Sequence, residues 1–375
     1  RVLIECGGNI VRRTRGGSHT VLEHLWPKLD LVVTIDFRMS ATALWSDIVL
    51  PAAQFYEKVA LDMPTYYFTM TDEAVPPAGE AKPEWEMFRL LCEAIARRAE
   101  ARGLDTFPHP DGTGPRYADL PARFTLDGAW LTDEQVNDEI VRDAAYSGIL
   151  PPGSDLSTMR EHGQMRFTDW GRGFMALSHA CPWPAEDEIA NPLEDHVERG
   201  APYPTLTRRA QFLIDHPWFA EAGEDLPVHK DIPTMGGDHP FMLLSGHNRW
   251  SVHAMNMGNP VLLQTHRGEP HAVVNDLDAA RLGLADHDRV RVSNDVGSFV
   301  VRVKTTGAQR PGVVTVYNGW DPHMFEGWNG TNDVSPGMVK HLGFVGGYGH
   351  LDYAPIGWQP VPADRGVRVR LEPVA

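Results

Sequence analysis

Cysteine is scarce in this sequence, and the three cysteines are far apart. Cys6, Cys92 and Cys181 form no Cys-x-x-Cys pair, so neither an iron–sulfur cluster nor a structural zinc site can be built from them in this chain. Their odd number also argues against a disulfide framework. We therefore expect each to be a buried free thiol.

Long hydrophobic runs and excess positive charge are also missing. No run of 18 apolar residues occurs, which predicts no transmembrane segment. Lys and Arg number 34 against 50 Asp and Glu, a formal charge of −16, and this argues against nucleic acid as a partner. The 375 residues, 42% hydrophobic and 22% charged, predict two or three globular domains. The chain begins directly at a strand-like Val2–Glu5, without an initiator Met or signal peptide. We expect that strand to need neighbours on both sides and the chain to be part of a longer subunit.

The most informative stretch is the donor loop, Ser245-Gly-His-Asn-Arg-Trp-Ser-Val-His253. It follows the strand-like run 240–244 and holds two imidazoles, a guanidinium, an indole, an amide and two hydroxyls. Such a set suits a large polar ligand with ring nitrogens, carbonyls and phosphates, although a polar surface loop has the same composition. His247 and His253 are six apart, which is not the spacing that places two metal ligands on one helical face. We therefore predict no metal ligand here.

The first 105 residues have an α/β pattern. The sequence predicts strands at 2–5, 31–35 and 47–51, with helices at 19–29 and 42–45 between them. Polar residues follow the first two strands, at Gly7–Asn9 and Asp36–Ser40. Ligands of open α/β sheets bind at the carboxyl ends of strands, but an aspartate there is also commonly a helix cap.

The remaining chain divides into a connector and a β-rich region. A helix is predicted at 84–102, followed by a loop-rich insertion and connector over 106–236 with short helices at 132–144 and 157–163. From 237 to 375 we expect a short helix that begins near Asn275 and ends at Gly283, then strands separated by turns. The predicted domains are therefore 1–105, 106–236 and 237–375.

The order of these pieces resembles the molybdopterin oxidoreductases of the dimethyl sulfoxide reductase family. The string Thr34–Glu57 is similar to the guanosine-binding segment of nitrate-reductase-type subunits, and residues 273–316 resemble the family's C-terminal barrel. The pattern formed by His247, Trp250 and His253, with Gly346–Leu351, resembles the branch of nitrate, selenate and perchlorate reductases and of ethylbenzene and steroid dehydrogenases. The fold class implied is α/β, a parallel doubly wound sheet domain followed by a six-stranded double-psi-type β-barrel.

The resemblance implies molybdenum bis(molybdopterin guanine dinucleotide) as cofactor. For Gln264 and Asn275, the implied cofactor contact has an ordinary structural alternative, which for Asn275 is a helix cap. The family's molybdenum ligand and the cysteines of its 4Fe-4S cluster belong to a preceding half of the subunit. We predict no metal ligand in this chain, and the sequence leaves the catalytic residues unknown. The implied cofactor-binding residues are Gly8, Asn9, Asp36, Phe37, Ser40, Asp47, Ser245, Gly246, His247, Arg249, Trp250, Ser251, His253, Gln264, Asn275, Gly347 and Tyr348.

Among the family's activities, the resemblance favours oxygen-independent hydroxylation of a hydrocarbon C–H bond, with water as the oxygen source. The reasons are the Trp-rich loop Trp320–Val334 and the ending His350–Tyr353. An oxyanion reductase is the first alternative, and such a site needs a positive lining that net charge cannot reveal. A non-catalytic binding or assembly module is the second, whereas a pyruvoyl decarboxylase lacks a convincing Gly-Ser cleavage site. Implied partners are an iron–sulfur beta subunit and a haem-binding gamma subunit, in the periplasm or, alternatively, on the cytoplasmic face of the inner membrane.

Overall fold

The computed structural model describes residues 1–63, 66–170, 179–203, 207–214, 217–221, 223, 225–229, 231, 234–249, 251–336 and 366–374. The chain folds into two compact units, Arg1–Val49 with Pro204–Ala375 and Leu50–Tyr203, and each has a hydrophobic core. The domain boundaries predicted from the sequence stay a prediction. No helix within the described ranges combines the length and the apolar character that crossing a membrane requires.

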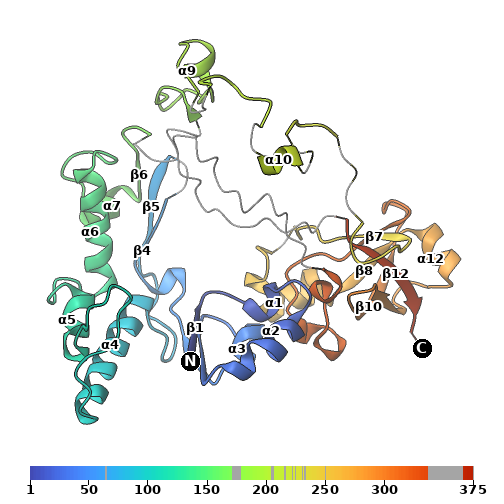
Figure 1. Ribbon diagram of the computed structural model, residues 1–375, viewed down its shortest axis with the longest axis horizontal. Coiled ribbons are helices and arrows are strands. Elements are labelled where there is room, and N and C mark those ends of the chain that lie inside the picture. Colours follow the sequence, from blue (N-terminus) through green and yellow to red (C-terminus); the bar gives the residue numbers. More distant parts are fainter. Residues whose placement is uncertain are drawn as a thin grey trace. The chain divides into compact units, whose positions relative to one another are not determined.

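A three-stranded sheet of order β1-β2-β3 begins the first unit (Figure 1). Strand β2 is almost wholly buried, as its continuous apolar run predicts, and it pairs in parallel with β1. Among the described strands β1 is an edge strand, with Val2 60% and Ile4 40% exposed, whereas the sequence predicts neighbours on both sides. The elements of this segment are β1 (Val2–Cys6), α1 (Ile10–Arg13), α2 (Ser18–His24), a 3-10 turn (Trp26–Lys28), β2 (Leu31–Asp36), α3 (Ala41–Leu44) and β3 (Ile48–Pro51).

The helix predicted over 19–29 is two pieces. Helix α2 ends at His24, and a separate 3-10 turn follows from Trp26 to Lys28. Pro27 explains the break, because it has no N–H for the next helical hydrogen bond and its ring collides with the preceding turn.

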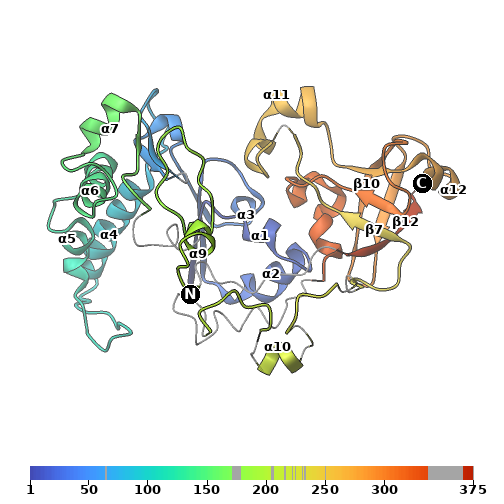
Figure 2. The same ribbon diagram turned by 90° about the horizontal axis from the view of Figure 1, so that it is seen from above.

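A closed six-stranded barrel of order β10-β8-β11-β7-β12-β9 forms the rest of the first unit (Figure 2). Strands β9 and β10 form an antiparallel hairpin whose alternate residues, such as Val290 and Val292, are fully buried. Together with the parallel sheet, this barrel confirms the predicted fold class. The elements are α10 (Pro217–Glu221), β7 (Phe241–Leu244), α11 (Pro260–Leu262), β8 (His271–Val274), α12 (Asp276–Leu282), β9 (Arg289–Ser293), β10 (Ser298–Thr305), β11 (Val313–Thr315) and β12 (Arg368–Pro373), with 3-10 turns at Met255–Gly258, Pro322–Met324, Glu326–Trp328 and Thr331–Val334 and a π turn at Leu263–Arg267.

Helix α12 has the ends that the sequence predicts. The Asn275 side chain accepts a hydrogen bond from Leu277 N and caps the first turn, and Gly283 ends the helix with φ at 68°. The Asn275 amide also donates to Gln309 O at 2.7 Å. Both polar atoms of this side chain are therefore used within the protein.

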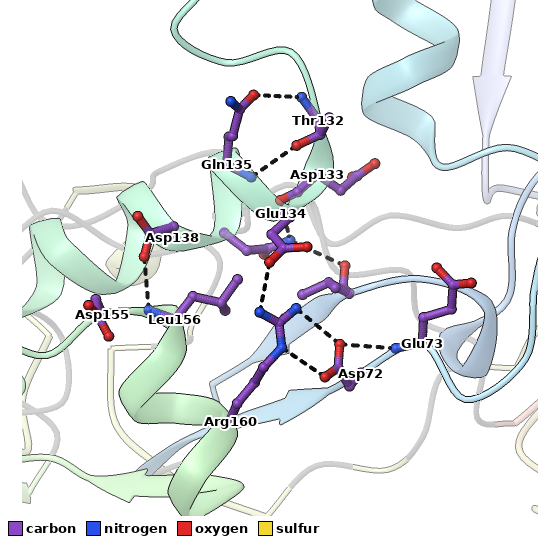
Figure 3. Close-up of polar contacts among 12 residues, drawn as sticks. Asp72, Glu73, Thr132, Asp133, Glu134, Gln135, Asp138, Asp155, Leu156 and Arg160 are labelled. Atoms are coloured by element: carbon purple, nitrogen blue, oxygen red, sulfur yellow. Dashed lines mark hydrogen bonds and ion pairs between the residues drawn. The ribbon is translucent and has the colours of Figure 1, made fainter.

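The second unit packs an antiparallel sheet of order β4-β5-β6 with helices. The helices predicted at 84–102, 132–144 and 157–163 are present with ends shifted by one or two residues. Polar contacts join the elements: Arg160 in α7 binds Asp72 after β5 and Glu134 in α6, and Thr132 and Gln135 form a capping box (Figure 3). The elements are a 3-10 turn (Phe55–Glu57), β4 (Ala60–Asp62), β5 (Tyr67–Thr71), α4 (Glu84–Ala101), a 3-10 turn (Tyr117–Asp119), α5 (Leu120–Thr125), α6 (Asp133–Tyr146), α7 (Leu156–His162), β6 (Gln164–Arg166) and α9 (Glu194–Val197).

Candidate functional site

A polar cleft of 840 Å³ lies in the first unit, between the segment 10–18 and the barrel loops. The barrel side is formed where β7 ends at Leu244 and by the loops over 317–322 and 330–333. These loops come from distant parts of the sequence. The closed barrel places them together, because β7 pairs with β11 and the loop that holds residues 317–322 begins just after β11 ends at Thr315.

Much of the predicted donor loop lies in this cleft. Ser245, Gly246, His247 and His253 line it, and the two imidazole rings meet edge to face with their centroids 4.5 Å apart. The Gly246 carbonyl accepts a hydrogen bond from Asn318 N at 2.9 Å, so the donor loop is fixed to the neighbouring loop.

The other predicted residues of this region are placed differently. Ser251 accepts a hydrogen bond from Arg267 at 2.9 Å, and Arg249 is exposed. Gln264 is exposed on the π turn and does not line the cleft. Asn275 also lies away from the described lining, and Trp250, Gly347 and Tyr348 lie outside the described residues.

The backbone of His253 is held in an uncommon conformation. Its φ is 49°, a region that non-glycine residues seldom occupy. Gly319, with φ at 104°, packs against the His253 carbonyl so closely that a Cβ at 319 would collide with the oxygen. A glycine at 319 is therefore required for this approach of the two loops.

Three arginines line the opposite side of the cleft. Arg12 Nε donates to Trp320 O at 3.0 Å, and Arg15 Nη1 donates to Asn332 Oδ1 at 3.1 Å, while Arg13 is exposed. The terminal nitrogens of Arg12 have no hydrogen-bond partner within the described part of the chain. Burial lowers the pKa of Arg12, partly opposed by Asp321. These side chains can donate to an anion in the cleft.

Asp333 is the one carboxyl group among the described residues that line the cleft. Its Oδ2 accepts a hydrogen bond from Gly330 N at 2.7 Å. Its Oδ1 is buried and accepts no hydrogen bond from the described part of the chain, although His19 Nδ1 lies 3.4 Å away, within ion-pair distance. Burial raises the pKa of Asp333, and His19 opposes that shift. The carboxyl group therefore offsets less of the arginine charge than a solvated aspartate would.

A buried network connects the strand ends with the barrel loop. The Asp321 carboxylate, fully buried, accepts from Asn9 Nδ2 at 2.6 Å and from Arg38 Nη1 at 2.7 Å. Asn9 Oδ1 accepts from both the N–H and the hydroxyl of Thr42. The predicted ligand residue Asn9 thus has protein partners for its whole amide group.

The remaining predicted residues lie at the same strand ends. Asp36 is 6% exposed, and its carboxylate has no hydrogen-bond partner among the described residues, while Phe37 is 37% exposed. Ser40 caps α3, and Asp47 accepts from Val32 N at 2.7 Å. Gly8 packs against the Glu5 carboxyl group, where a Cβ would collide with it. Their roles in cofactor binding stay predictions.

Sequence reasoning missed Arg12, Arg13, Arg15, Asp321 and Asp333. The run Arg12-Arg13-Thr14-Arg15 followed by two glycines was a usable signal, since clustered arginines beside glycines are typical of anion sites. No local pattern marks Asp321 or Asp333 as buried. Within the described residues, no group of three or more His, Cys, Asp or Glu side chains could hold a metal ion.

Comparison with known proteins connects this cleft to a family. Residues 16–94 match the model of the molybdopterin oxidoreductases, and residues 241–340 match the molybdopterin dinucleotide binding domain. The barrel side of the cleft lies within the second matched region, whereas the segment 10–18 reaches the first matched region only at Ser18. The chain belongs to the molybdopterin oxidoreductases.

Several members of this family align with nearly the whole chain. The respiratory nitrate reductase subunit alpha of Haloferax mediterranei is 35% identical over 96% of the chain and 38% of its own length. The perchlorate reductase subunit alpha of Dechloromonas aromatica is 32% identical over 99% of the chain and 39% of its length. The dimethylsulfide dehydrogenase subunit alpha of Rhodovulum sulfidophilum is 30% identical over 99% of the chain and 40% of its length. The chain therefore spans about two fifths of these relatives.

A solved structure shares the fold. Acetylene hydratase from Pelobacter acetylenicus superposes with a TM-score of 0.60 at 16% identity, covering 99% of this chain and 44% of that one. At this identity the likeness concerns the fold alone.

The side chains of this molybdopterin oxidoreductase fit a dinucleotide. The arginines and the donor loop offer hydrogen bonds to a diphosphate. Acceptors for pterin or guanine N–H groups are also present, since Asn318 Oδ1 is buried at the cleft with no partner in the described ranges and Asp36 is buried at a strand end.

Proposed function

We propose that this chain is the cofactor-binding part of the catalytic subunit of an oxyanion reductase, with molybdenum bis(molybdopterin guanine dinucleotide) as its cofactor. One observation carries the proposal. In a chain of net charge −16, the described lining of the cleft holds three arginines and one carboxyl group. A cleft lined by one sign of charge concentrates ligands of the opposite sign. The names of the nitrate and perchlorate reductases among the relatives support an oxyanion as substrate.

Hydrocarbon hydroxylation has weaker support than the sequence suggested. It rested on the Trp-rich loop 320–334, but that loop contributes Asn332 and Asp333 to the cleft, and its Trp320 ring lies under the guanidinium of Arg267. Trp320, Pro322 and Phe325 of the same loop also line the cleft, so the wall is mixed and not the predominantly apolar pocket that an alkylbenzene or a sterol would favour. The segment His350–Tyr353, the second basis for that hypothesis, lies outside the described residues.

The protein's own side chains would bind and orient the cofactor and the substrate. The terminal nitrogens of Arg12 would donate to phosphate or substrate oxygens, and the imidazole N–H groups of His247 and His253 would donate from the opposite loop. Asn318 Oδ1 would accept from a ring N–H. When bound, the molybdenum centre of the cofactor supplies oxygen-atom exchange coupled to two-electron transfer. We assign no catalytic acid or base to this chain.

Other parts of the working enzyme belong to this proposal. A preceding part of the subunit would supply the molybdenum ligand and a 4Fe-4S cluster, and electrons would pass through an iron–sulfur beta subunit and a haem-binding gamma subunit. The relatives named as alpha subunits support a multi-subunit complex. A periplasmic location stays a prediction, with the cytoplasmic face of the inner membrane as its alternative.

The test uses the intact catalytic subunit with its partners. We expect molybdenum and guanine nucleotide in the purified enzyme, and turnover of nitrate, chlorate or perchlorate with a reduced viologen dye. Oxidation of ethylbenzene with a ferrocenium acceptor, without turnover of any of the three oxyanions, would contradict the proposal. Enzyme free of both molybdenum and guanine nucleotide would favour the non-catalytic module.

Arg12 gives a residue-level test of the cleft. Arg12→Gln removes a charge-assisted donor worth about 1.5–3 kcal/mol, which corresponds to roughly ten- to hundredfold weaker anion binding. We expect the weaker binding to appear as a higher KM for the oxyanion or as a lower cofactor content. Arg12→Lys should lie between wild type and Arg12→Gln. Arg302→Gln is the matched control, because Arg302 is half exposed and pairs with Glu269 away from the cleft. Equal values for Arg12→Gln and wild type would remove Arg12 from the anion site.

A further inference from the structure

Arg267 lies behind the donor loop, at the end of the π turn Leu263–Arg267, and is only 7% exposed. Its Nη1 donates to Ser251 Oγ and its Nη2 donates to Asn318 O, both at 2.9 Å. Its guanidinium carbon stands 4.5 Å from the centroid of the Trp320 ring. One side chain therefore joins the donor loop to the loop 317–320, and both loops line the cleft.

The charge of Arg267 has no counter-ion among the described residues. The neighbouring carboxylates are engaged elsewhere, since Glu269 pairs with Arg302 at 3.1 Å and Asp321 pairs with Arg38 at 2.7 Å. The Nε of Arg267 is buried and has no hydrogen bond to any residue that the structure describes. Burial alone lowers its pKa. An unpaired buried charge is strongly unfavourable, and the contact with Trp320 offsets only part of that cost.

The peptide that Arg267 binds also presents an unused donor. No hydrogen bond joins the Gly319 N–H to another described residue, although Gly319 is buried at the cleft lining. The peptide between Asn318 and Gly319 is trans, so its C=O and N–H point in opposite directions. Because the C=O points to Arg267, the N–H points away from it. Gly319 has no side chain to shield the charge, and a Cβ there would stand 3.6 Å from Nη2.

We propose that Arg267 is a positioning residue for an anion in the cleft, bound at the Gly319 N–H and electrically balanced by the buried guanidinium behind it. The guanidinium polarises the 318–319 peptide and fixes its orientation, which strengthens donation from the N–H. The anion is a phosphate-like or oxyanion group, and it comes either from the diphosphate of the cofactor or from the substrate. This inference rests on the proposed anion-binding function of the cleft.

Two substitutions separate charge from hydrogen bonding in the intact enzyme complex. Arg267→Lys keeps the charge but loses the fork that reaches both loops, and Arg267→Gln keeps a hydrogen-bond donor but loses the charge. Arg302→Gln is again the control. The measurements are guanine nucleotide content per subunit after gel filtration, and KM and kcat for the oxyanion with reduced viologen.

The two sources of the anion give different results. If it is the cofactor diphosphate, Arg267→Gln should lower guanine nucleotide content at least tenfold under dilution, while the loaded fraction keeps its KM. If it is the substrate, nucleotide content should stay at the wild-type value and KM should rise at least tenfold with kcat nearly unchanged. In both cases Arg267→Lys should lose less than Arg267→Gln.

The inference is overturned if Arg267→Gln matches wild type in both measurements. It is also overturned if Arg267→Lys is as impaired as Arg267→Gln, because loop bridging without a charge effect would then explain both. Where Arg267→Gln fails to fold, Arg267→Lys decides: its nucleotide content and KM must lie within threefold of wild type. Failure of the proposed function is a different result, in which the wild-type enzyme itself holds no guanine nucleotide and reduces no oxyanion.

Discussion

Replacing Asp321 with alanine should loosen the connection between the parallel sheet and the barrel loop. The carboxylate is fully buried and binds Arg38, whose side chain is 15% exposed, as well as Asn9. Removal of one partner of a buried ion pair costs about 3–5 kcal/mol. The lost hydrogen bond to Asn9 adds about 1 kcal/mol. Because Arg38 keeps some access to solvent, we take the lower end of this sum and expect local stability to fall by about 4 kcal/mol, mainly in the segment 31–45.

Hydrogen exchange read by mass spectrometry is the suitable assay, because a chain with two compact units need not unfold in one step. A loss of about 4 kcal/mol corresponds to roughly a thousandfold faster exchange in peptides from 31–45. The control is Asp295→Ala, because this carboxylate is 71% exposed and pairs with His239 at the surface. Exchange within threefold of wild type over 31–45 would refute the reasoning. Equal acceleration in the β9–β10 hairpin would show that Asp321 stabilises the barrel itself.

Two further predictions concern single side chains. Burial raises the pKa of Asp133 in the second unit from 3.8 to about 6, with Glu84 adding to the shift and Lys58 opposing it. The folded state therefore favours the protonated acid, and stability is lost as pH rises from about 4 to about 6. Asp133→Asn should stabilise the unit by about 1–2 kcal/mol at pH 7.5 after allowance for partial exposure, and should leave its stability unchanged at pH 3.5. Urea titration of wild type and variant at both pH values measures this. An equal effect of the substitution at the two pH values would contradict the prediction. Gly319→Ala should displace the His253 carbonyl and lower the guanine nucleotide content of the enzyme severalfold, while circular dichroism shows an unchanged fold. A nucleotide content equal to that of wild type would show that the two loops can separate without loss of cofactor.

Local patterns in the sequence predicted the elements with the strongest periodicity. The apolar run of β2, the amphipathic stripe of α4 and the cap-to-glycine span of α12 depend on neighbours a few residues away, so they can be read locally. The donor loop at the end of β7 was also predictable, because a polar, aromatic loop after a buried strand is a recognisable local feature.

The cleft could not be predicted in the same way. Arg12 reaches Trp320, and Asn9 reaches Asp321, across more than three hundred positions. Only the tertiary fold decides such pairs. The same limit applies to Asn9 and Asn275, whose side chains could serve a ligand or the protein. The structure gives both amide groups protein partners, which residue type and spacing do not specify.

The topology of the barrel also has a consequence for biosynthesis. Strand β7 leads into the donor loop and has β11 on one side and β12 on the other, with Phe241 opposite Val369. During translation β7 emerges long before β12, so one edge of it stays open while the intervening residues are made. Such distant pairing is slow and leaves an aggregation-prone edge in the nascent chain. The donor loop that continues from β7 is therefore held by a closed barrel only after β12 has been made.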